Sequence, residues 1–286
     1  MKLAACRKAF ETVHPYLYSA SECREVFRRI LEFLTGMRYE DLLRMEDIDL
    51  DELRLQHLLD EIKSGKPIQY ITGYEWFGSL KLLVNPHVLI PRPETEELVH
   101  WIRDDIRLSG QASLRCLDIG TGSGCIAIAL KVLFPSLQMQ AMDISREALQ
   151  LAARNAAQHH VGITFMEADI LKTGFWLDES PDILISNPPY ILPDEKTGMD
   201  KRVLAFEPHE ALFVTNQDAL QFYKAICLLA QQQLREGGMV YLELHQDHAT
   251  DCVLLFREAG FEVTLKKDFL QNDRFRSEER RVGKEC

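Results

Sequence analysis

The spacing of apolar residues changes along the chain, and each change predicts a new kind of element. Up to residue 66, apolar residues recur every three or four positions, as on amphipathic helices. Ser19 and Glu22 have the spacing of a capping box before one such run, and Asp49 and Glu52 repeat it before another. We therefore expect a small helical N-terminal domain over residues 1–66.

The period shortens after this region. Residues 74–77 and 80–84 are mostly apolar and flank a Gly-Ser pair, which predicts a β-hairpin within a linker over residues 67–88. Beyond the hairpin, short apolar strands alternate with helical segments. Because this alternation is typical of a parallel sheet covered by helices on both faces, we expect a Rossmann-like α/β domain over residues 89–275.

The end of the chain has a different pattern. Residues 276–286 (Arg-Ser-Glu-Glu-Arg-Arg-Val-Gly-Lys-Glu-Cys) contain one aliphatic residue and no period. The segment resembles the conceptual translation of a sequencing-adapter oligonucleotide, and we expect a non-native tail. A last antiparallel strand would then be partly missing or built from foreign residues. A native charged tail is the alternative.

The composition is that of a soluble globular protein. The 286 residues suffice for one large and one small domain, and 46% of them are hydrophobic. No apolar run reaches the roughly 20 residues that span a bilayer, and the first residues lack the apolar core of a signal peptide. The seven cysteines form no Cys-x-x-Cys pair, so we expect reduced thiols, a cytoplasmic protein and no metal site. The net charge of −11 disfavours non-specific binding to duplex nucleic acid.

The strand at residues 182–186 runs directly into Asn187-Pro188-Pro189-Tyr190. Two consecutive prolines remove two backbone donors and fix φ, so this segment should form a stiff extended arch. In open α/β sheets, ligands bind at the carboxyl ends of the strands. The Asn187 amide and the neighbouring carbonyls are therefore expected to receive a planar NH2 group there.

A glycine-rich segment, Gly120-Thr121-Gly122-Ser123-Gly124, lies between a predicted strand and a predicted helix. Backbone N–H groups and the positive end of the helix can hold an anion at such a place. The spacing is not Gly-x-Gly-x-x-Gly and no Gly-Lys-Ser/Thr follows, which disfavours dinucleotide and P-loop phosphate sites. A ligand with a carboxylate fits such a helix start equally well.

Asp143 ends the next predicted strand, about 20 residues after the glycine-rich segment, where an acid can accept both hydroxyls of a ribose. A ribose and an amino-acid carboxylate without phosphate indicate S-adenosylmethionine. Asp143 alone is a weak signal, since strands often end in Asp. Asp169, after the third strand, could accept the adenine amino group or could simply cap a loop.

Two further segments have open interpretations. Arg92 stands between two prolines before a predicted helix, and Glu94 and Glu96 behind it could serve only to start that helix. The long loop over residues 191–213 contains Glu207, and loops of this length are usually functional or disordered.

Five motifs, in order, resemble those of the peptide chain release factor glutamine methyltransferases, and the resemblance extends from about residue 20 to Phe275. Asn-Pro-Pro-Tyr alone is shared by many amino-methylating enzymes, whereas Pro-Arg-Pro-Glu-Thr-Glu after a helical module is more specific. The motifs are Pro67–Gly73, Ile90–Glu96, Asp118–Gly124, Ser186–Ile191 and Phe206–Pro208.

The resemblance implies a cytoplasmic, class I S-adenosylmethionine-dependent methyltransferase whose N-terminal domain docks class I release factors. The enzyme would methylate the side-chain amide nitrogen of the glutamine in their Gly-Gly-Gln motif and so modulate translation termination, without a metal. The implied cofactor contacts are Gly120, Thr121, Gly122, Ser123, Gly124, Asp143, Asp169, Ile170 and Asn187, where some relatives have an aromatic residue in place of Ile170. The implied catalytic and substrate contacts are Asn187, Pro188, Pro189 and Tyr190, with Arg92 and Glu207 also on the substrate side.

Two other functions remain to be compared with this one. A DNA adenine methyltransferase uses a similar arch on a flipped base, but the acidic charge and the lack of a basic recognition domain disfavour it. A non-catalytic binding protein on the same fold is disfavoured by the intact glycine-rich segment, Asp143 and Asn187.

Overall fold

The computed structural model describes residues 3–11, 19–45, 47–48, 50–111, 113–172, 174–267, 269 and 273–280. The chain divides into two compact units. The first comprises Met1–Tyr74 and Asp200–Phe206, and the second comprises Glu75–Met199 and Glu207–Cys286. None of the described helices is long and apolar enough to cross a membrane.

The first unit is helical, as the sequence predicts. Its helices are α1 (Leu3–Glu11), α2 (Ala20–Thr35), α3 (Tyr39–Leu42), α4 (Glu52–Lys63), α5 (Ile68–Thr72) and α9 (Lys201–Phe206). The predicted capping box of Ser19 and Glu22 is present at the start of α2, and Gly36 ends this helix in the left-handed conformation. Leu31, Leu42 and Ile62 are completely buried in the core between these helices.

The predicted start of α4 is wrong in detail. Its N-cap is Asp51, whose carboxylate accepts hydrogen bonds from Leu53 N at 2.9 Å and Arg54 N at 3.2 Å. The spacing of Asp49 and Glu52 predicts an earlier cap, and Asp49 itself lies outside the described residues. An Asp that directly precedes the helix binds the free N–H groups of the first turn better than one further away.

Helix α9 comes from the long loop that the sequence assigns to the α/β domain, yet it clusters with the N-terminal helices. Arg202 of α9 lies with Nη2 3.9 Å from Glu22 Oε1. A Cβ placed on Gly65 would lie 3.6 Å from Arg202 Cγ, so α9 also lies close to the end of α4.

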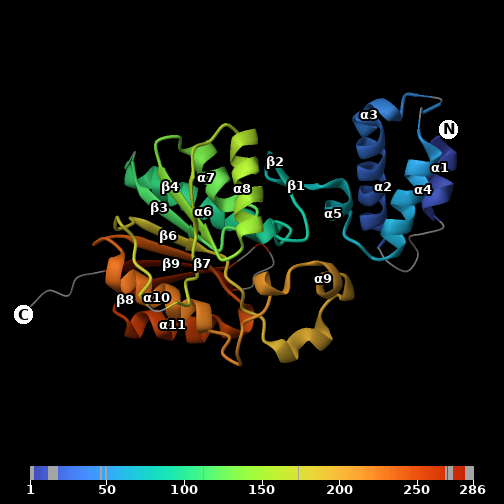
Figure 1. Cartoon of the computed structure of the whole chain (residues 1–286). Helices are drawn as coiled ribbons and strands as arrows, with labels where there is room; N and C mark the ends of the chain where they lie inside the picture. The colour runs from blue at the N-terminus through green and yellow to red at the C-terminus, as the bar shows by residue number, and fades with distance from the viewer. Residues whose placement is uncertain are drawn as a thin grey trace, which may run out of the picture. The chain divides into compact units, whose positions relative to one another are not determined.

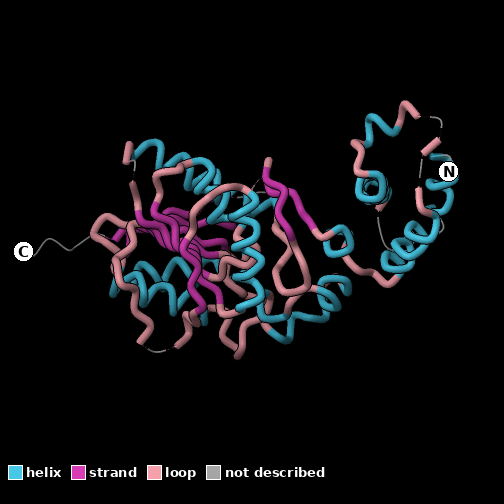
Figure 2. Tube along the Cα trace, turned by 45° about the horizontal axis from the view of Figure 1, so that its top comes forward, coloured by secondary structure: helices cyan, strands magenta, loops and turns pink. Residues whose placement is uncertain are grey.

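The second unit is built on the predicted hairpin and a seven-stranded sheet. The hairpin consists of β1 (Tyr74–Phe77) and β2 (Leu80–Leu83). The strands of the sheet are magenta in Figure 2, and their order is β5-β4-β3-β6-β7-β9-β8. Its strands are β3 (Arg115–Ile119), β4 (Gln138–Asp143), β5 (Thr164–Glu167), β6 (Ile183–Ser186), β7 (Met239–Glu243), β8 (Phe261–Lys267) and β9 (Asp273–Arg280). β9 runs antiparallel to both of its neighbours, and the other neighbouring strands are parallel.

Helices cover both faces of this sheet (Figure 1). One face carries α6 (Pro93–Ser109), α7 (Cys125–Leu133) and α8 (Arg146–Gln158), and the other carries α10 (Gln221–Gln233) and α11 (Ala249–Glu258). Short 3-10 helices η1 (Pro193–Gly198), η2 (His209–Ala211) and η3 (Gln246–His248) lie in the connections.

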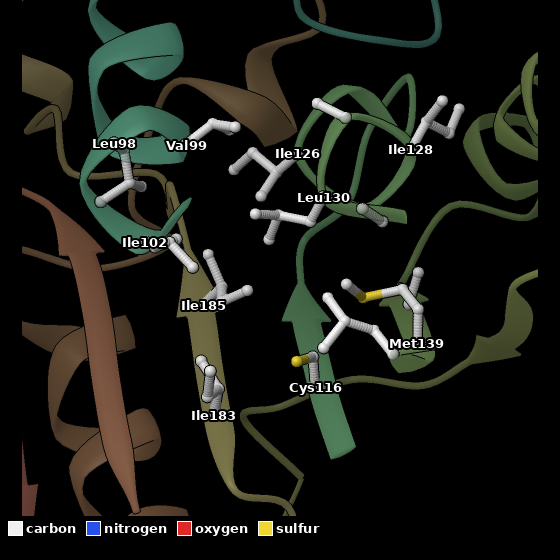
Figure 3. Close-up of a cluster of buried hydrophobic side chains, with 14 of the residues drawn as sticks. Leu98, Val99, Ile102, Cys116, Ile126, Ile128, Leu130, Met139, Ile183 and Ile185 are labelled. Carbon is white, nitrogen blue, oxygen red and sulfur yellow. The ribbon is translucent and has the colours of Figure 1, made fainter. Parts of the chain in front are cut away.

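Strand β6 contributes side chains to the hydrophobic cores on both faces of the sheet. Ile183 and Ile185 point to the core under α6 and α7 (Figure 3). Leu184 belongs to the core under α10 and α11. Successive side chains of a strand point to opposite faces, and helices cover both faces here, so the strand is apolar throughout. The predicted doubly covered parallel sheet is confirmed.

The backbone of Arg276–Arg280 lies in β9 and pairs with both β7 and β8. The expected non-native tail therefore overlaps the last strand, and residues 281–286 lie outside the described residues. The origin of this segment stays a prediction.

Candidate active site

The carboxyl ends of β3, β4 and β6 meet at one edge of the sheet. β3 pairs with β4 on one side and with β6 on the other, so the strand order reverses beside it. Ligands bind at such a switch point in open α/β sheets. A cavity of about 340 Å³ lies at this edge, between the glycine-rich loop after β3, the arch after β6 and the start of α6.

The glycine-rich loop contains three residues with positive φ: Gly120 at 72°, Gly122 at 55° and Gly124 at 83°. Residues with a Cβ rarely adopt this conformation. Backbone hydrogen bonds of 2.9 Å from Gly120 N and Thr121 N to the Met142 carbonyl fix the loop to the end of β4. The loop thus has a defined shape at the cavity wall.

The three glycines have different surroundings. A Cβ on Gly120 or Gly122 would meet no atom within 4 Å, and both residues line the cavity. A Cβ on Gly124 would lie 3.0 Å from Ile128 Cδ1 and 3.2 Å from Ala152 Cβ. The first two glycines therefore leave room for a ligand close to the backbone, whereas the third permits close packing of α7 against α8.

Asp118 at the end of β3 also supports this loop, and it is not among the predicted site residues. Thr121 Oγ1 donates a 2.7 Å hydrogen bond to Asp118 Oδ2. Asp118 is completely buried, and this burial raises the pKa of its carboxyl to about 7, although the bond from Thr121 opposes the shift. An acid two positions before the first glycine is the sequence signal that could have identified it.

Asp143 lies at the end of β4 and lines the cavity. Its carboxylate accepts hydrogen bonds of 2.9 Å from Gly122 N and from Ser145 N. Burial raises the pKa of Asp143, and these two donors partly offset that shift. The residue therefore connects the glycine-rich loop to the start of α8 and keeps a carboxylate at the cavity.

Asp169 and Ile170 also line the cavity. Asp169 Oδ1 accepts a 2.9 Å hydrogen bond from Leu171 N, so the residue does cap its loop. Ile170 is half-buried and packs against the core under α10. The cavity wall next to Asp169 is therefore aliphatic at this position.

The arch follows β6, and Asn187, Pro188 and Pro189 line the cavity. Ser186 Oγ donates a 2.7 Å hydrogen bond to the Ile119 carbonyl. This bond fixes the beginning of the arch to the end of β3, beside the glycine-rich loop.

The Asn187 side chain contacts the first turn of α6. Its Nδ2 donates a 3.2 Å hydrogen bond to Thr95 Oγ1, and the Thr95 hydroxyl donates a 2.8 Å hydrogen bond to Glu243 Oε2. Thr95 and Glu243 are each only 3% exposed. Neither was predicted as a site residue, since nothing in the sequence pairs two residues that lie this far apart in the chain.

Tyr190 is half-buried beside the core under α10 and is not among the residues that line the cavity. Its ring centroid lies 5.3 Å from that of His245, with a tilt of 49°. Tyr190 thus packs on the segment that follows β7.

Arg92 and Glu207 form an ion pair, with Arg92 Nη2 2.5 Å from Glu207 Oε1. The Glu207 side chain is 1% exposed, and its Oε2 accepts a 3.2 Å hydrogen bond from Ile90 N. Arg92 is also the N-cap residue of α6, with Pro93 in the first turn. The segment therefore serves both as a helix start and as the attachment of the long loop.

The structure brings most of the predicted site residues to one cavity. Glu207, Gly124 and Tyr190 lie outside its lining, although Glu207 forms an ion pair with Arg92, which lines it. Within the described residues, no three His, Cys, Asp or Glu side chains are placed to hold a metal ion. The predicted residues that line the cavity are Arg92, Gly120, Thr121, Gly122, Ser123, Asp143, Asp169, Ile170, Asn187, Pro188 and Pro189.

The sheet order, the glycine-rich loop after β3 and the acid that ends β4 define a class I methyltransferase. Comparison with known proteins agrees: the methyltransferase small domain family matches residues 104–206. A solved methyltransferase from Pyrococcus furiosus superimposes with a TM-score of 0.52 at 17% identity, covering 72% of this chain and 91% of its own. This likeness supports the fold alone.

The particular family follows from curated relatives. The chain is 43% identical to the release factor glutamine methyltransferase of Flavobacterium psychrophilum, over 90% of this chain and 92% of the relative. It is 37% identical to that of Bacteroides thetaiotaomicron, over 90% of this chain and 93% of the relative. The chain belongs to the release factor glutamine methyltransferase family, which confirms the resemblance of its motifs.

Proposed function

We propose that this protein transfers a methyl group from S-adenosylmethionine to the side-chain amide nitrogen of a glutamine in class I release factors. The acceptor is the glutamine of their Gly-Gly-Gln motif, and the reaction takes place in the cytoplasm. The names of the relatives support the release factor as substrate. The observation that carries the proposal is the Asn187 amide, held by Thr95 at the wall of a cavity that the glycine-rich loop also lines.

The residues of the cavity fit S-adenosylmethionine. Gly120 and Gly122 leave open space where a Cβ would stand, so an amino-acid carboxylate can approach the backbone at the start of α7. Asp143 offers a half-buried carboxylate to ribose hydroxyls at the end of β4. Asp169 and Ile170 line the cavity where the adenine would lie in this arrangement.

The arch binds the methyl acceptor, which is the side-chain amide of the substrate glutamine. A primary amide nitrogen is a poor nucleophile because its lone pair is delocalised into the carbonyl. Asn187 Oδ1 and the Pro188 carbonyl would accept the two N–H bonds of the substrate amide and orient its lone pair. When bound, S-adenosylmethionine supplies a methyl group on a positively charged sulfur, which keeps the electron pair of the carbon–sulfur bond as the methyl moves to nitrogen.

Fixed oxygen dipoles also favour the transition state. Positive charge moves toward the substrate nitrogen as the new bond forms, and both acceptors of the arch would face that charge. The two prolines hold these acceptors in place, so alignment costs little at the moment of reaction. One N–H proton leaves the methylated nitrogen, and water can take it.

A methyl-transfer assay with labelled S-adenosylmethionine tests this function. The acceptors are a class I release factor, its Gly-Gly-Gln→Gly-Gly-Ala variant, and duplex DNA. We expect label on the unmodified release factor alone. Label on DNA but not on the release factor would replace the proposal with a DNA methyltransferase, and label on the alanine variant would move the acceptor to another residue.

A further inference from the structure

Asn187, Thr95 and Glu243 form a chain of two side-chain hydrogen bonds. The direction of each bond follows from the chemistry of the groups that take part. The three side chains come from the end of β6, the first turn of α6 and the end of β7. Asn187 Nδ2 lies 3.2 Å from Thr95 Oγ1, and Thr95 Oγ1 lies 2.8 Å from Glu243 Oε2. Asn187 and Thr95 line the cavity, whereas Glu243 is not part of its lining.

The carboxylate determines the direction of the whole chain of bonds. An ionised carboxylate only accepts hydrogen bonds, and a hydroxyl has one hydrogen to donate. The Thr95 hydrogen therefore goes to Glu243, and Thr95 Oγ1 can offer only lone pairs to its other neighbour. A partner at that position must be a donor, so the NH2 side of the Asn187 amide faces Thr95.

The two sides of an Asn amide have nearly the same shape but opposite hydrogen-bonding character. With Nδ2 bound to Thr95, Asn187 presents Oδ1 as its remaining group. A rotated amide would instead place Oδ1 against Thr95 Oγ1, acceptor against acceptor, and would present two N–H donors to a substrate NH2 group. Such an arch could not receive a glutamine amide.

We propose that Glu243 and Thr95 are positioning residues that fix the orientation of the Asn187 amide, so that Oδ1 is the group offered to the acceptor amide of the substrate. This inference rests on the proposed function for its substrate, but not for the orientation itself. Glu243 is not part of the cavity lining, and its contact with Thr95 connects it to Asn187.

Isosteric variants separate this role from simple packing. Thr95→Val removes the hydroxyl and keeps the shape, whereas Thr95→Ser retains the hydroxyl. Glu243→Gln keeps the shape but can donate to Thr95 Oγ1, which releases the Thr95 hydrogen to bond Asn187 Oδ1 and stabilises the rotated amide.

Tyr241→Phe is the matched control. Tyr241 of β7 donates a 2.9 Å hydrogen bond to Asp105 Oδ2 of α6, so this pair joins the same two elements away from the cavity. A loss of contact between α6 and β7 would affect this variant and the Thr95 variants alike. A loss of orientation would affect only the latter.

The experiment measures kcat and KM for a release factor, the Kd for S-adenosylmethionine and the thermal unfolding of each variant. We expect kcat to fall roughly 10- to 100-fold in Thr95→Val and in Glu243→Gln, with little change in Kd. Thr95→Ser and Tyr241→Phe should keep most of the wild-type kcat. The double variant Thr95→Val/Glu243→Gln should be no worse than Thr95→Val, because the two residues act in series. Near-normal kcat in the single variants, or losses that multiply, would overturn the proposal.

A second readout needs no substrate. In the ¹⁵N spectrum of the full chain, the side-chain NH2 of Asn187 should have one proton protected from exchange in wild type and Thr95→Ser. That protection should disappear in Thr95→Val. If neither proton of the Asn187 NH2 is protected in the wild type, the proposed orientation is wrong. If one proton is protected but the enzyme does not methylate release factor, only the proposed function is contradicted.

Discussion

The side-chain amide of Asn155 donates a 2.9 Å hydrogen bond to the backbone carbonyl of Ser123, within the glycine-rich loop. The same amide exchanges hydrogen bonds with both backbone groups of Leu83 in the hairpin, at 2.7 and 3.0 Å. Asn155 is completely buried on α8. One side chain therefore connects the hairpin to the loop proposed to hold the methyl donor.

Asn155→Asp should weaken both connections. A carboxylate cannot donate to the Ser123 and Leu83 carbonyls, and it would be buried against two acceptors. We expect a loss of about 3 kcal/mol in the free energy of unfolding, measured with urea, and weaker binding of S-adenosylmethionine in calorimetry. Gln158→Glu on the exposed side of the same helix removes one donor to Lys81 and should have almost no effect.

Asn187→Ala removes the side-chain acceptor of the arch. If Asn187 Oδ1 stabilises the transition state, kcat for methyl transfer to release factor should fall by roughly 100- to 1,000-fold. The melting temperature should change little, since the backbone of the arch is retained. Near-normal turnover in this variant would refute the role of Asn187.

Asp143→Ala removes the carboxylate that accepts hydrogen bonds from Gly122 N and Ser145 N. We expect the KM for S-adenosylmethionine to rise about 10- to 100-fold, because the ribose loses its acceptor and the loop loses an anchor. The KM for release factor should stay close to its wild-type value. An unchanged KM for the methyl donor would place the ribose elsewhere.

Asp118 should make stability depend on pH. Burial raises the pKa of its carboxyl from 3.8 to about 7, so between these values the unfolded chain loses the proton while the folded protein keeps it. The folded state therefore loses stability as the pH rises from about 4 to 7, by roughly 3–4 kcal/mol, and the loss is constant above that range. Asp118→Asn should remove this contribution. Urea unfolding of both proteins at about pH 4.5 and about pH 8 measures it, and parallel pH profiles would contradict it.

The ion pair of Arg92 and Glu207 provides a test on the long loop. Arg92→Met removes the cation beside the Glu207 carboxylate, whose side chain is 1% exposed. We expect the free energy of unfolding to fall by about 2–3 kcal/mol, less than for a fully buried pair because Arg92 is partly exposed. Adding Glu207→Gln should recover part of this loss, since the buried charge is then gone. Chemical denaturation of the two single variants and the double variant gives the coupling free energy. If the losses in the free energy of unfolding of the two single variants add up in the double variant, the ion pair contributes nothing to stability.

Local patterns in the sequence predict much of this molecule. The capping box at Ser19, the hairpin and the strand that runs into Asn187 depend on residues close together in the chain, and the structure has each of them. The position of Asp143 after the glycine-rich segment relies on the regular length of one strand–helix–strand unit. These features need no knowledge of tertiary contacts.

The remaining features depend on contacts between distant segments. Thr95 and Glu243 are 148 positions apart, and Asn155 lies 72 positions from Leu83. An isolated Thr or Asn in a helix has no pattern that identifies its partner, so these residues were not predicted. The association of α9 with the N-terminal helices is missed for the same reason.

The position of β9 has a consequence for how the protein is made. Among the described strands, β8 pairs only with β9, although β8 comes first in the chain. During synthesis β8 therefore leaves the ribosome before its partner exists, and β7 has an open edge until β9 enters between them. The sheet cannot be completed until residues 273–280 have been made, and a nascent chain stalled before residue 273 exposes two unpaired edges to its neighbours on the polysome.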